Sequence, residues 1–339
     1  MLFRFSAMGD VAMTVPVVKV LADSYPDMEI IVVSRPFFKP VFNGIPQVKY
    51  VGIDLKNNYK GVGGLYRLFL ELKKYNPHVI ADLHDVLRTK ILRFFFGMAG
   101  YRVAVIDKGR KEKKALTRSQ NKVFKALTST HERYADVFRK LGYQIDLNRY
   151  TPAVPDLSPQ VSLFFENFKN QKIVGIAPFA AHAGKEYPLK KTAEVISLLL
   201  QKDKTIHILL FGGGNREKER LDELEKIDRN RVVNLAGVFS FEEELQVISR
   251  LDAMLSMDSA NGHLASMYAV PVISIWGVTH PYAGFVPLAQ PAENQITPDL
   301  KVFPQLPTSV YGNKTFEGYQ KIWETIEPEF ITQRILQTI

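Results

Sequence analysis

The segment SMDSANGHLA, residues 256–265, places an acid, a hydroxyl, an amide, a glycine and a histidine between two apolar stretches. LDAMLSM before it predicts a short buried strand, and LASMYAVPVISIWG after it predicts a helix and another strand. α/β proteins bind ligands where a strand gives way to a helix. The first-turn N–H groups of a helix lack intrahelical partners, so Ser259, Ala260, Asn261 and Gly262 are predicted to bind an anion.

A second candidate is the basic segment from Lys108 to Lys125. It contains eight lysines and arginines against one acid, Glu112, and carries most of the formal net charge of +9. Such a segment can be a solvated loop, a docking surface for an anionic partner or a nucleic-acid patch. No known DNA- or RNA-binding module accompanies it, so we expect an acidic lipid surface or a phosphorylated substrate and no nucleic acid. Because like charges repel, we expect a mobile loop.

Several common chemistries are excluded. The chain has no cysteine, and therefore no disulfide, thiolate metal site or cysteine nucleophile. GGGNRE at 212–217 has Glu217 where a dinucleotide fingerprint needs its third glycine. FAAHAGKE at 179–186 has Phe179 and Glu186 where a P-loop needs glycine and a hydroxyl.

Apolar runs and helical patterns alternate along the chain, which predicts parallel sheets covered by helices. The alternation occurs twice, with a proline-rich linker at 148–171 that contains Pro152, Pro155 and Pro159. We therefore expect an α/β protein with Rossmann-like domains at 1–155 and 172–315. A helical tail at 316–339, interrupted by Pro328, is expected to pack back on the N-terminal domain.

Composition agrees with two ordinary domains, since 46% of the 339 residues are hydrophobic. No secretory signal pattern opens the sequence, and no stretch approaches about 20 apolar residues, the length of a membrane span. We expect a cytoplasmic protein.

Two stretches resemble a known family. RFSAMGDVAMTVPVVKVL (4–21) resembles the opening of the heptosyltransferases, the inverting glycosyltransferases of family 9. MDSANGHLASMYAVPVISIWGVTHP (257–281) resembles their second signature, and HERYADVFRKLG (131–142) resembles, less specifically, a segment before the linker. The resemblance implies a GT-B fold, with two Rossmann-like domains whose parallel sheets face a central cleft. The N-terminal domain would bind the acceptor and the C-terminal domain the nucleotide sugar.

The resemblance also implies a reaction, the transfer of a sugar from a nucleotide sugar to a lipopolysaccharide core or related surface glycan. The donor is ADP-heptose in the best-known members. Inverting transfer needs a base for the acceptor hydroxyl, and Asp10 follows Gly9 at the end of the first predicted strand. Alternatively, Asp10 only caps the helix predicted from Val11. Gly9 is expected to allow a tight turn, and Ser6 to form a hydrogen bond in the same loop.

The family's phosphate-contacting lysine corresponds to Lys185, which could otherwise be a solvated surface residue. Asp258 resembles the aspartate that contacts the donor or is an N-cap, and His263 either donates to phosphate or packs in the core. This chain has Ala260 where the family often has glycine. The other expected donor contacts are Glu217, or alternatively Glu219, for the ribose and Val238 or Phe239 for the adenine.

On the acceptor side we expect Ser6, Gly9, Lys111, Lys113 and Lys114. The implied partners are a nucleotide sugar, a lipid-linked glycan and, peripherally, the inner membrane, with no bound cofactor and no metal site. Two other classes stay open: a non-catalytic nucleotide-sugar-binding homologue, which an altered Asp10 or Lys185 would have favoured, and a two-domain epimerase, against which RFSAMGD argues. A GT-B enzyme with another nucleotide sugar is the alternative within the first class.

Overall fold

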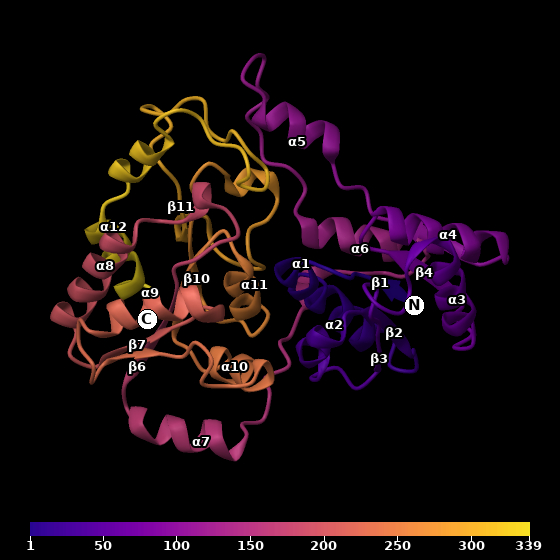
Figure 1. Ribbon diagram of the computed structural model, residues 1–339, viewed down its shortest axis with the longest axis horizontal. Coiled ribbons are helices and arrows are strands. Elements are labelled where there is room, and N and C mark those ends of the chain that lie inside the picture. The colour runs from indigo at the N-terminus through magenta and orange to yellow at the C-terminus, as the bar shows by residue number, and fades with distance from the viewer. The chain divides into compact units, whose positions relative to one another are not determined.

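The computed structural model describes residues 1–339, which separate into two compact units (Figure 1). The first unit comprises 1–108 and 130–153, and the second comprises 109–129 and 154–339. Each unit contains one sheet of parallel strands with helices between them. The predicted α/β class with two Rossmann-like sheets is therefore confirmed.

The first sheet has five parallel strands in the order β3-β2-β1-β4-β5. The strands are β1 (Leu2–Phe3), β2 (Ile30–Ser34), β3 (Val48–Gly52), β4 (Val79–Asp82) and β5 (Arg102–Val105). The chain builds from β1 out to β3 and then crosses over to β4 on the other side of β1. The strand order thus reverses between β1 and β4, and such a reversal opens a crevice at the carboxyl ends of the two strands.

The helices of the first unit follow from the spacing of apolar residues. In α3 (Gly61–Lys73), Leu65, Leu68 and Leu72 recur at helical spacing and are buried. They pack with Phe3, Phe5 and other residues of the first core. The other helices are α1 (Met8–Ala12), α2 (Val15–Ser24), α4 (Leu87–Met98) and α6 (Thr130–Lys140).

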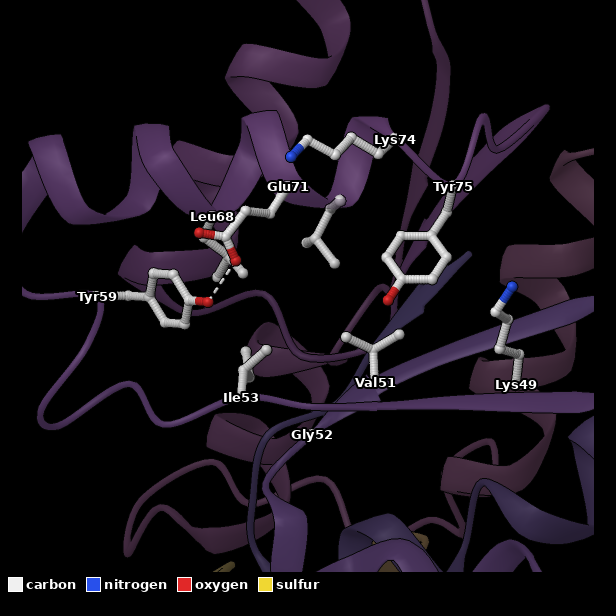
Figure 2. A pocket seen from close by; sticks show the side chains of 10 residues that line it. Lys49, Val51, Gly52, Ile53, Tyr59, Leu68, Glu71, Lys74 and Tyr75 are labelled. Atoms are coloured by element: carbon white, nitrogen blue, oxygen red, sulfur yellow. Dashed lines mark hydrogen bonds between the residues drawn. The ribbon is translucent and has the colours of Figure 1, made fainter.

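A cavity of about 550 Å³ lies between β3 and α3 (Figure 2). Val51, Ile53 and Leu68 form its apolar part. The Tyr59 hydroxyl donates to Glu71 over 2.6 Å, and this bond raises the pKa of Tyr59 to about 12. None of the residues that the sequence singled out for chemistry lines this cavity.

The second sheet has six parallel strands in the order β11-β10-β9-β6-β7-β8. The strands are β6 (Lys172–Ala177), β7 (Ile206–Leu210), β8 (Val232–Asn234), β9 (Ala253–Met257), β10 (Val272–Ile275) and β11 (Gln295–Ile296). Here the strand order reverses between β6 and β9, which pair in register with Ala177 opposite Ser256. The carboxyl ends of β6 and β9 therefore open the crevice of this unit.

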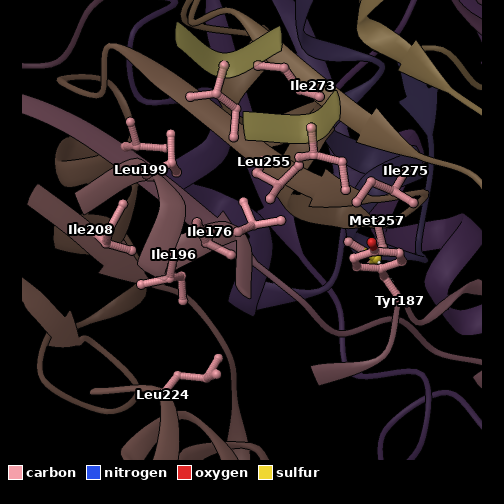
Figure 3. Packing of buried hydrophobic residues seen from close by; sticks show 14 of the residues in the cluster. Ile176, Tyr187, Ile196, Leu199, Ile208, Leu224, Leu255, Met257, Ile273 and Ile275 are labelled. Atoms are coloured by element: carbon pink, nitrogen blue, oxygen red, sulfur yellow. Dashed lines mark hydrogen bonds between the residues drawn. The ribbon is translucent and has the colours of Figure 1, made fainter. Parts of the chain in front are cut away.

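The core of the second unit joins strand residues with residues of α8, α9 and α12 (Figure 3). The helices between residues 154 and 339 have the following bounds. They are α7 (Pro159–Phe165), α8 (Leu189–Lys202), α9 (Gly214–Glu225), α10 (Phe241–Ile248), α11 (Ala260–Ser266) and α12 (Pro328–Leu336). In α8, Val195, Ile196 and Leu199 are fully buried. No helix of either unit is long and apolar enough to cross a membrane.

Two predictions about the linker and the tail are corrected. Pro159 does not only interrupt a linker: Ser158 caps α7, and Pro159 occupies its first turn, where the missing N–H has no cost. The tail belongs to the second unit. Pro328 begins α12, which packs against α8 because Ile331 and Ile335 are fully buried in the second core.

The basic segment also differs from the prediction of a mobile loop in the N-terminal domain. Residues 110–117 form helix α5 (Arg110–Thr117), and 109–129 belong to the second unit. Lys113 is buried with its ammonium 4.2 Å from the Phe285 ring centroid, and the Phe124 ring packs against His280 and Tyr282. Cation–π and aromatic contacts, which net charge does not reveal, therefore pack α5 and Phe124 within the second unit.

Candidate functional site

The reversal of strand order in the second sheet brings Lys185 and Asp258 together. Asp258 directly follows β9, and Lys185 ends the short helix η4 (Ala183–Lys185) in the loop after β6. The Lys185 Nζ lies 3.1 Å from the Asp258 Oδ2, and the two side chains are only 12% and 8% exposed. Lys185 is therefore a paired residue of the crevice and not a solvated surface lysine.

The residues of the predicted anion site lie at the start of the neighbouring helix α11. Ser259 is its N-cap in extended conformation, but the side chain makes no capping hydrogen bond. The Ser259 Oγ is buried and has no hydrogen-bond partner in the protein. Leaving a buried hydroxyl unpaired costs about 1–3 kcal/mol, so a ligand oxygen would find a ready donor here.

The other predicted residues of α11 have different positions. Ala260 and Asn261 are half-buried in its first turn, and His263 is buried one turn later. Gly262 has a packing role: a Cβ there would lie 2.6 Å from the Ser256 Oγ and 3.3 Å from the Val272 Cγ1. The glycine thus lets α11 approach β9 and β10 closely.

A third loop, after β10, completes this edge of the sheet. The Val278 N–H donates to the Gly184 carbonyl over 2.9 Å, which ties the loop to the one that carries Lys185. A Cβ on Gly277 would lie 2.1 Å from the same carbonyl, so the approach requires glycine. The buried Thr279 Oγ1 has no hydrogen-bond partner in the protein. Sequence reasoning missed Thr279, although the G-x-T-x-P pattern at 277–281 could have indicated it.

Helix α9, which follows β7, contains the residues expected to contact the ribose. The half-buried Glu217 accepts from the Gly213 N–H over 2.8 Å, so its carboxylate also caps α9. Glu219 is exposed on α9. The burial and position of Glu217, beside the end of a sheet strand, favour it over Glu219 for a ligand contact.

The two candidates for the adenine contact are now distinguishable. The Phe239 ring packs edge-on against Phe164 of α7, with ring centroids 5.3 Å apart. Val238 is 50% exposed and follows Gly237, which has a positive φ of 77°. Since Phe239 already has an aromatic partner, Val238 is the better candidate for a flat base.

In the first unit, Asp10 lies at the β1/β4 reversal. It is the third residue of α1, which begins at Met8 and not at Val11, and it accepts from the Ala7 N–H over 3.3 Å. Its Oδ2 also lies 2.5 Å from Nη2 of the buried Arg4, whose Nη1 donates to the Leu83 carbonyl after β4. Asp10 therefore does stabilise the helix start, while Arg4 fixes its carboxylate at the crevice.

The expected tight turn at Gly9 is wrong. Gly9 is the second residue of α1, and its carbonyl accepts from the Met13 N–H over 2.9 Å as in an ordinary helix. The chain turns earlier, because β1 ends at Phe3, and Ser6 lies half-buried in the connection.

His84, which the sequence analysis did not consider, lies at the same crevice after β4. Its Nδ1 accepts from the Phe5 N–H at 3.4 Å. Burial, together with the positive charge of nearby Arg4, lowers the pKa of His84 to about 3. An imidazole of that pKa is neutral near pH 7 and a weak base, which leaves Asp10 as the stronger candidate for proton abstraction.

The remaining predicted residues are the lysines of α5. Lys111 and Lys114 are exposed, whereas Lys113 is buried against Phe285. Only the first two are therefore open to a large anionic partner. No group of three or more histidine, aspartate or glutamate side chains with metal-site geometry occurs in residues 1–339.

Comparisons with known proteins agree with this arrangement. The lipopolysaccharide core heptosyltransferase OpsX of Haemophilus influenzae is 23% identical over 83% of this chain and 79% of its own. Lipopolysaccharide heptosyltransferase 1 of Campylobacter coli is 24% identical over 83% of this chain and 84% of its own. Among solved structures, Escherichia coli heptosyltransferase WaaC with ADP matches with a TM-score of 0.68 and 18% identity, over 100% of this chain and 99% of the other.

A glycosyltransferase of family 9 from Veillonella parvula matches with a TM-score of 0.73 and 16% identity, over 99% of this chain and 94% of the other. These likenesses confirm the expected GT-B fold. Residues 65–306, most of the chain, match the sequence pattern of glycosyltransferase family 9 (heptosyltransferase). With the two sheets and the polar groups at their carboxyl edges, this match shows that the chain belongs to glycosyltransferase family 9, the heptosyltransferases.

Proposed function

We propose that this glycosyltransferase transfers heptose from ADP-heptose to a lipopolysaccharide core or related surface glycan, with inversion at the anomeric carbon. The observation that carries the proposal is the group at the β6/β9 reversal: the Lys185 ammonium, the unpartnered Ser259 hydroxyl and the α11 N-terminus. A cation, a hydroxyl donor and free N–H groups suit a diphosphate. The printed names of the relatives support the choice of heptose and lipopolysaccharide.

The donor would bind at the carboxyl edge of the second sheet. Lys185, Ser259 and the first-turn N–H groups of α11 would hold the diphosphate, and Asp258 would hold sugar hydroxyls. Glu217 would hold the ribose and Val238 the base. A helix terminus alone contributes about 0.3–1 kcal/mol, up to about 2 when partly buried. Lys185 is therefore needed, because removing one preorganised donor typically costs about 2.7–4 kcal/mol.

The chemical step would use Asp10 as the base. The acceptor hydroxyl oxygen attacks the anomeric carbon and forms the new glycosidic bond, while its proton passes to the Asp10 carboxylate. The bond between the anomeric carbon and the phosphate oxygen breaks, and ADP leaves with the electron pair. The ion pair with Arg4, at 2.5 Å, supports this role because it orients the carboxylate. The proposal requires that Asp10 of the first unit and Lys185 of the second unit act on the same acceptor and donor during one transfer.

The acceptor is proposed to be lipid-linked, and the enzyme to work in the cytoplasm, peripherally at the inner membrane. The exposed Lys111 and Lys114 of α5 support an anionic acceptor, since lipopolysaccharide cores carry phosphates and acidic sugars. Lys113, buried against Phe285, is assigned to holding α5 in place.

The test uses the purified full chain and a lipopolysaccharide core acceptor. We expect turnover with ADP-heptose and little with UDP- or GDP-linked sugars; preference for another nucleotide sugar would overturn the donor assignment. Asp10→Asn should lower kcat about 10²–10⁴-fold without weakening ADP binding. Asp23→Asn, which breaks the exposed pair with Lys19, is the matched control. Near-normal turnover in folded Asp10→Asn protein would show that another group is the base.

A further inference from the structure

Helices α3 and α4 of the first unit pack side by side (Figure 1). Both leave large apolar side chains exposed to solvent. Three lie on each helix, and all six are between 43% and 76% exposed. They are Val62, Tyr66 and Leu70 on α3 and Leu87, Phe94 and Met98 on α4. We call these six residues the α3–α4 apolar face. Single exposed apolar residues are ordinary, but a clustered set marks an interaction surface.

The six side chains form one surface. Positions 62, 66 and 70 follow one stripe of α3, and positions 87, 94 and 98 follow one stripe of α4, because each set repeats at helical spacing. The two stripes are joined by aromatic rings. Tyr66 lies 5.2 Å from Phe95 between ring centroids, and Phe95 lies 6.0 Å from Phe94.

Basic side chains border this face. α4 contains Arg88, Lys90 and Arg93 and no acid. The acid of α3, Glu71, accepts from Tyr59 at the cavity between β3 and α3 (Figure 2). Arg93 is bound to Asp82 and Asp85. Lys90 lies 3.9 Å from Asp85 but keeps an exposed side chain, and Arg88 is exposed beside Leu87. The surface therefore combines an apolar stripe with positive charge.

We infer that the α3–α4 apolar face is a docking surface for an anionic lipid bilayer, with its apolar side chains inserted at headgroup depth. Helices that lie in a membrane interface have this combination of leucine and phenylalanine on one face and lysine and arginine beside it. The inference rests on the proposed function in one respect: an enzyme that acts on a lipid-linked acceptor has to reach the membrane.

The experiment measures binding of the full chain to vesicles by cosedimentation. One set of vesicles contains phosphatidylglycerol and phosphatidylethanolamine, and the other contains phosphatidylcholine alone. The variant Leu87→Ser/Phe94→Ser/Met98→Ser should lower the partition onto anionic vesicles at least about tenfold. Arg88→Gln/Lys90→Gln should lower it on anionic vesicles only, by about fivefold for each charge removed.

The matched control removes the same kinds of side chain elsewhere. Leu163, Val302 and Phe330 are 56–64% exposed in the second unit, so Leu163→Ser/Val302→Ser/Phe330→Ser should bind vesicles like wild type. Melting temperatures verify folding, and Met98→Ser alone, expected to lower binding a few-fold, replaces the triple variant if that is unstable. Equal losses in both triple variants, or no vesicle binding by wild type, would overturn the inference. So would a concentration-dependent dimer that only the α3–α4 variant abolishes, since the face would then bind a second copy.

Transfer to a water-soluble core oligosaccharide separates this inference from the proposed function. We expect the α3–α4 variant to retain that activity. If wild type binds vesicles but transfers no heptose, the proposed function fails and the docking surface stands.

Discussion

The ion pair between Lys185 and Asp258 predicts opposite changes in ADP affinity when one or the other residue is replaced. In the protein without ligand, Asp258 neutralises Lys185 at 3.1 Å, so a diphosphate has to compete with a carboxylate for the ammonium. Asp258→Asn removes that competitor and its repulsion. It should therefore tighten ADP binding about tenfold, equivalent to about 1.4 kcal/mol, while transfer slows because a sugar contact is lost. Lys185→Met should weaken ADP binding at least about tenfold.

The same two variants should lower stability. At an effective dielectric constant of about 20, the attraction across 3.1 Å is about 5 kcal/mol. Removing one partner of a buried pair costs about 3–5 kcal/mol, because it leaves an uncompensated charge. The asparagine amide can still accept a hydrogen bond, so we expect about 3 kcal/mol for Asp258→Asn. Lys185→Met/Asp258→Asn should recover most of this loss but none of the ADP affinity.

Calorimetric titration with ADP and chemical denaturation measure the two effects. Lys226 and Glu223 form an exposed ion pair of the second unit at 2.7 Å, so Glu223→Gln is the matched control and should change neither quantity much. If Asp258→Asn weakens ADP binding as much as Lys185→Met does, the competition argument is wrong. Unchanged ADP affinity in Lys185→Met would remove the lysine from the phosphate site.

Three further predictions concern the loop after β10 and helix α5. Burial lowers the pKa of His280 to about 4, below the value of about 6.5 in the unfolded chain. The unfolded chain therefore binds the proton first, and the folded state loses stability as the pH falls from about 6.5 to about 4. Denaturation against pH should show a loss of at most about 3 kcal/mol that His280→Asn removes; equal slopes in both proteins would contradict it. Gly277→Ala should destabilise the second unit by about 1–3 kcal/mol and weaken ADP binding, because its Cβ would overlap the Gly184 carbonyl, and a normal melting curve would refute this. Lys111→Gln/Lys114→Gln should raise the acceptor KM without changing the melting temperature. Lys113→Gln should mainly increase hydrogen exchange across 110–117, because it removes the contact with Phe285. The reverse pattern would assign acceptor binding to Lys113 and helix packing to Lys111 and Lys114.

The sequence was most informative where strands are buried on both faces. In the second unit, runs such as KIVGIAPF and VPVISIWG are continuously apolar and coincide with β6 and β10. In the first unit, the sequence signal of β3 is weak, because VKYVG is a short edge strand with only partial burial and an exposed lysine. α5 was expected to be a loop because charge patterning shows repulsion but not the ring of Phe285, which is distant in sequence.

The candidate site was predictable in its residue types but not in its pairings. The family signatures indicated Asp10, Lys185 and Asp258, which each follow a predicted strand. That Lys185 contacts Asp258 depends on β6 lying beside β9, and strand order is not visible in local periodicity. Arg4 was overlooked for the same reason, since its role depends on β1 and β4 being neighbours. Thr279 could be recognised only from the structure, because a loop threonine is ordinary in sequence and only the structure shows that its buried hydroxyl has no hydrogen-bond partner.

Both crevices solve the same electrostatic problem. A base for the acceptor and a cation for the diphosphate have to be charged before substrate arrives, yet an isolated charge in a partly buried crevice is costly. In the first unit Arg4 balances Asp10, and in the second Asp258 balances Lys185. In each crevice a single ion pair both neutralises the reactive side chain and holds it in position. In the proposed mechanism, part of the attraction between Lys185 and the diphosphate would therefore be used to replace Asp258. That replacement would free the Asp258 carboxylate for sugar hydroxyls once the phosphates are bound.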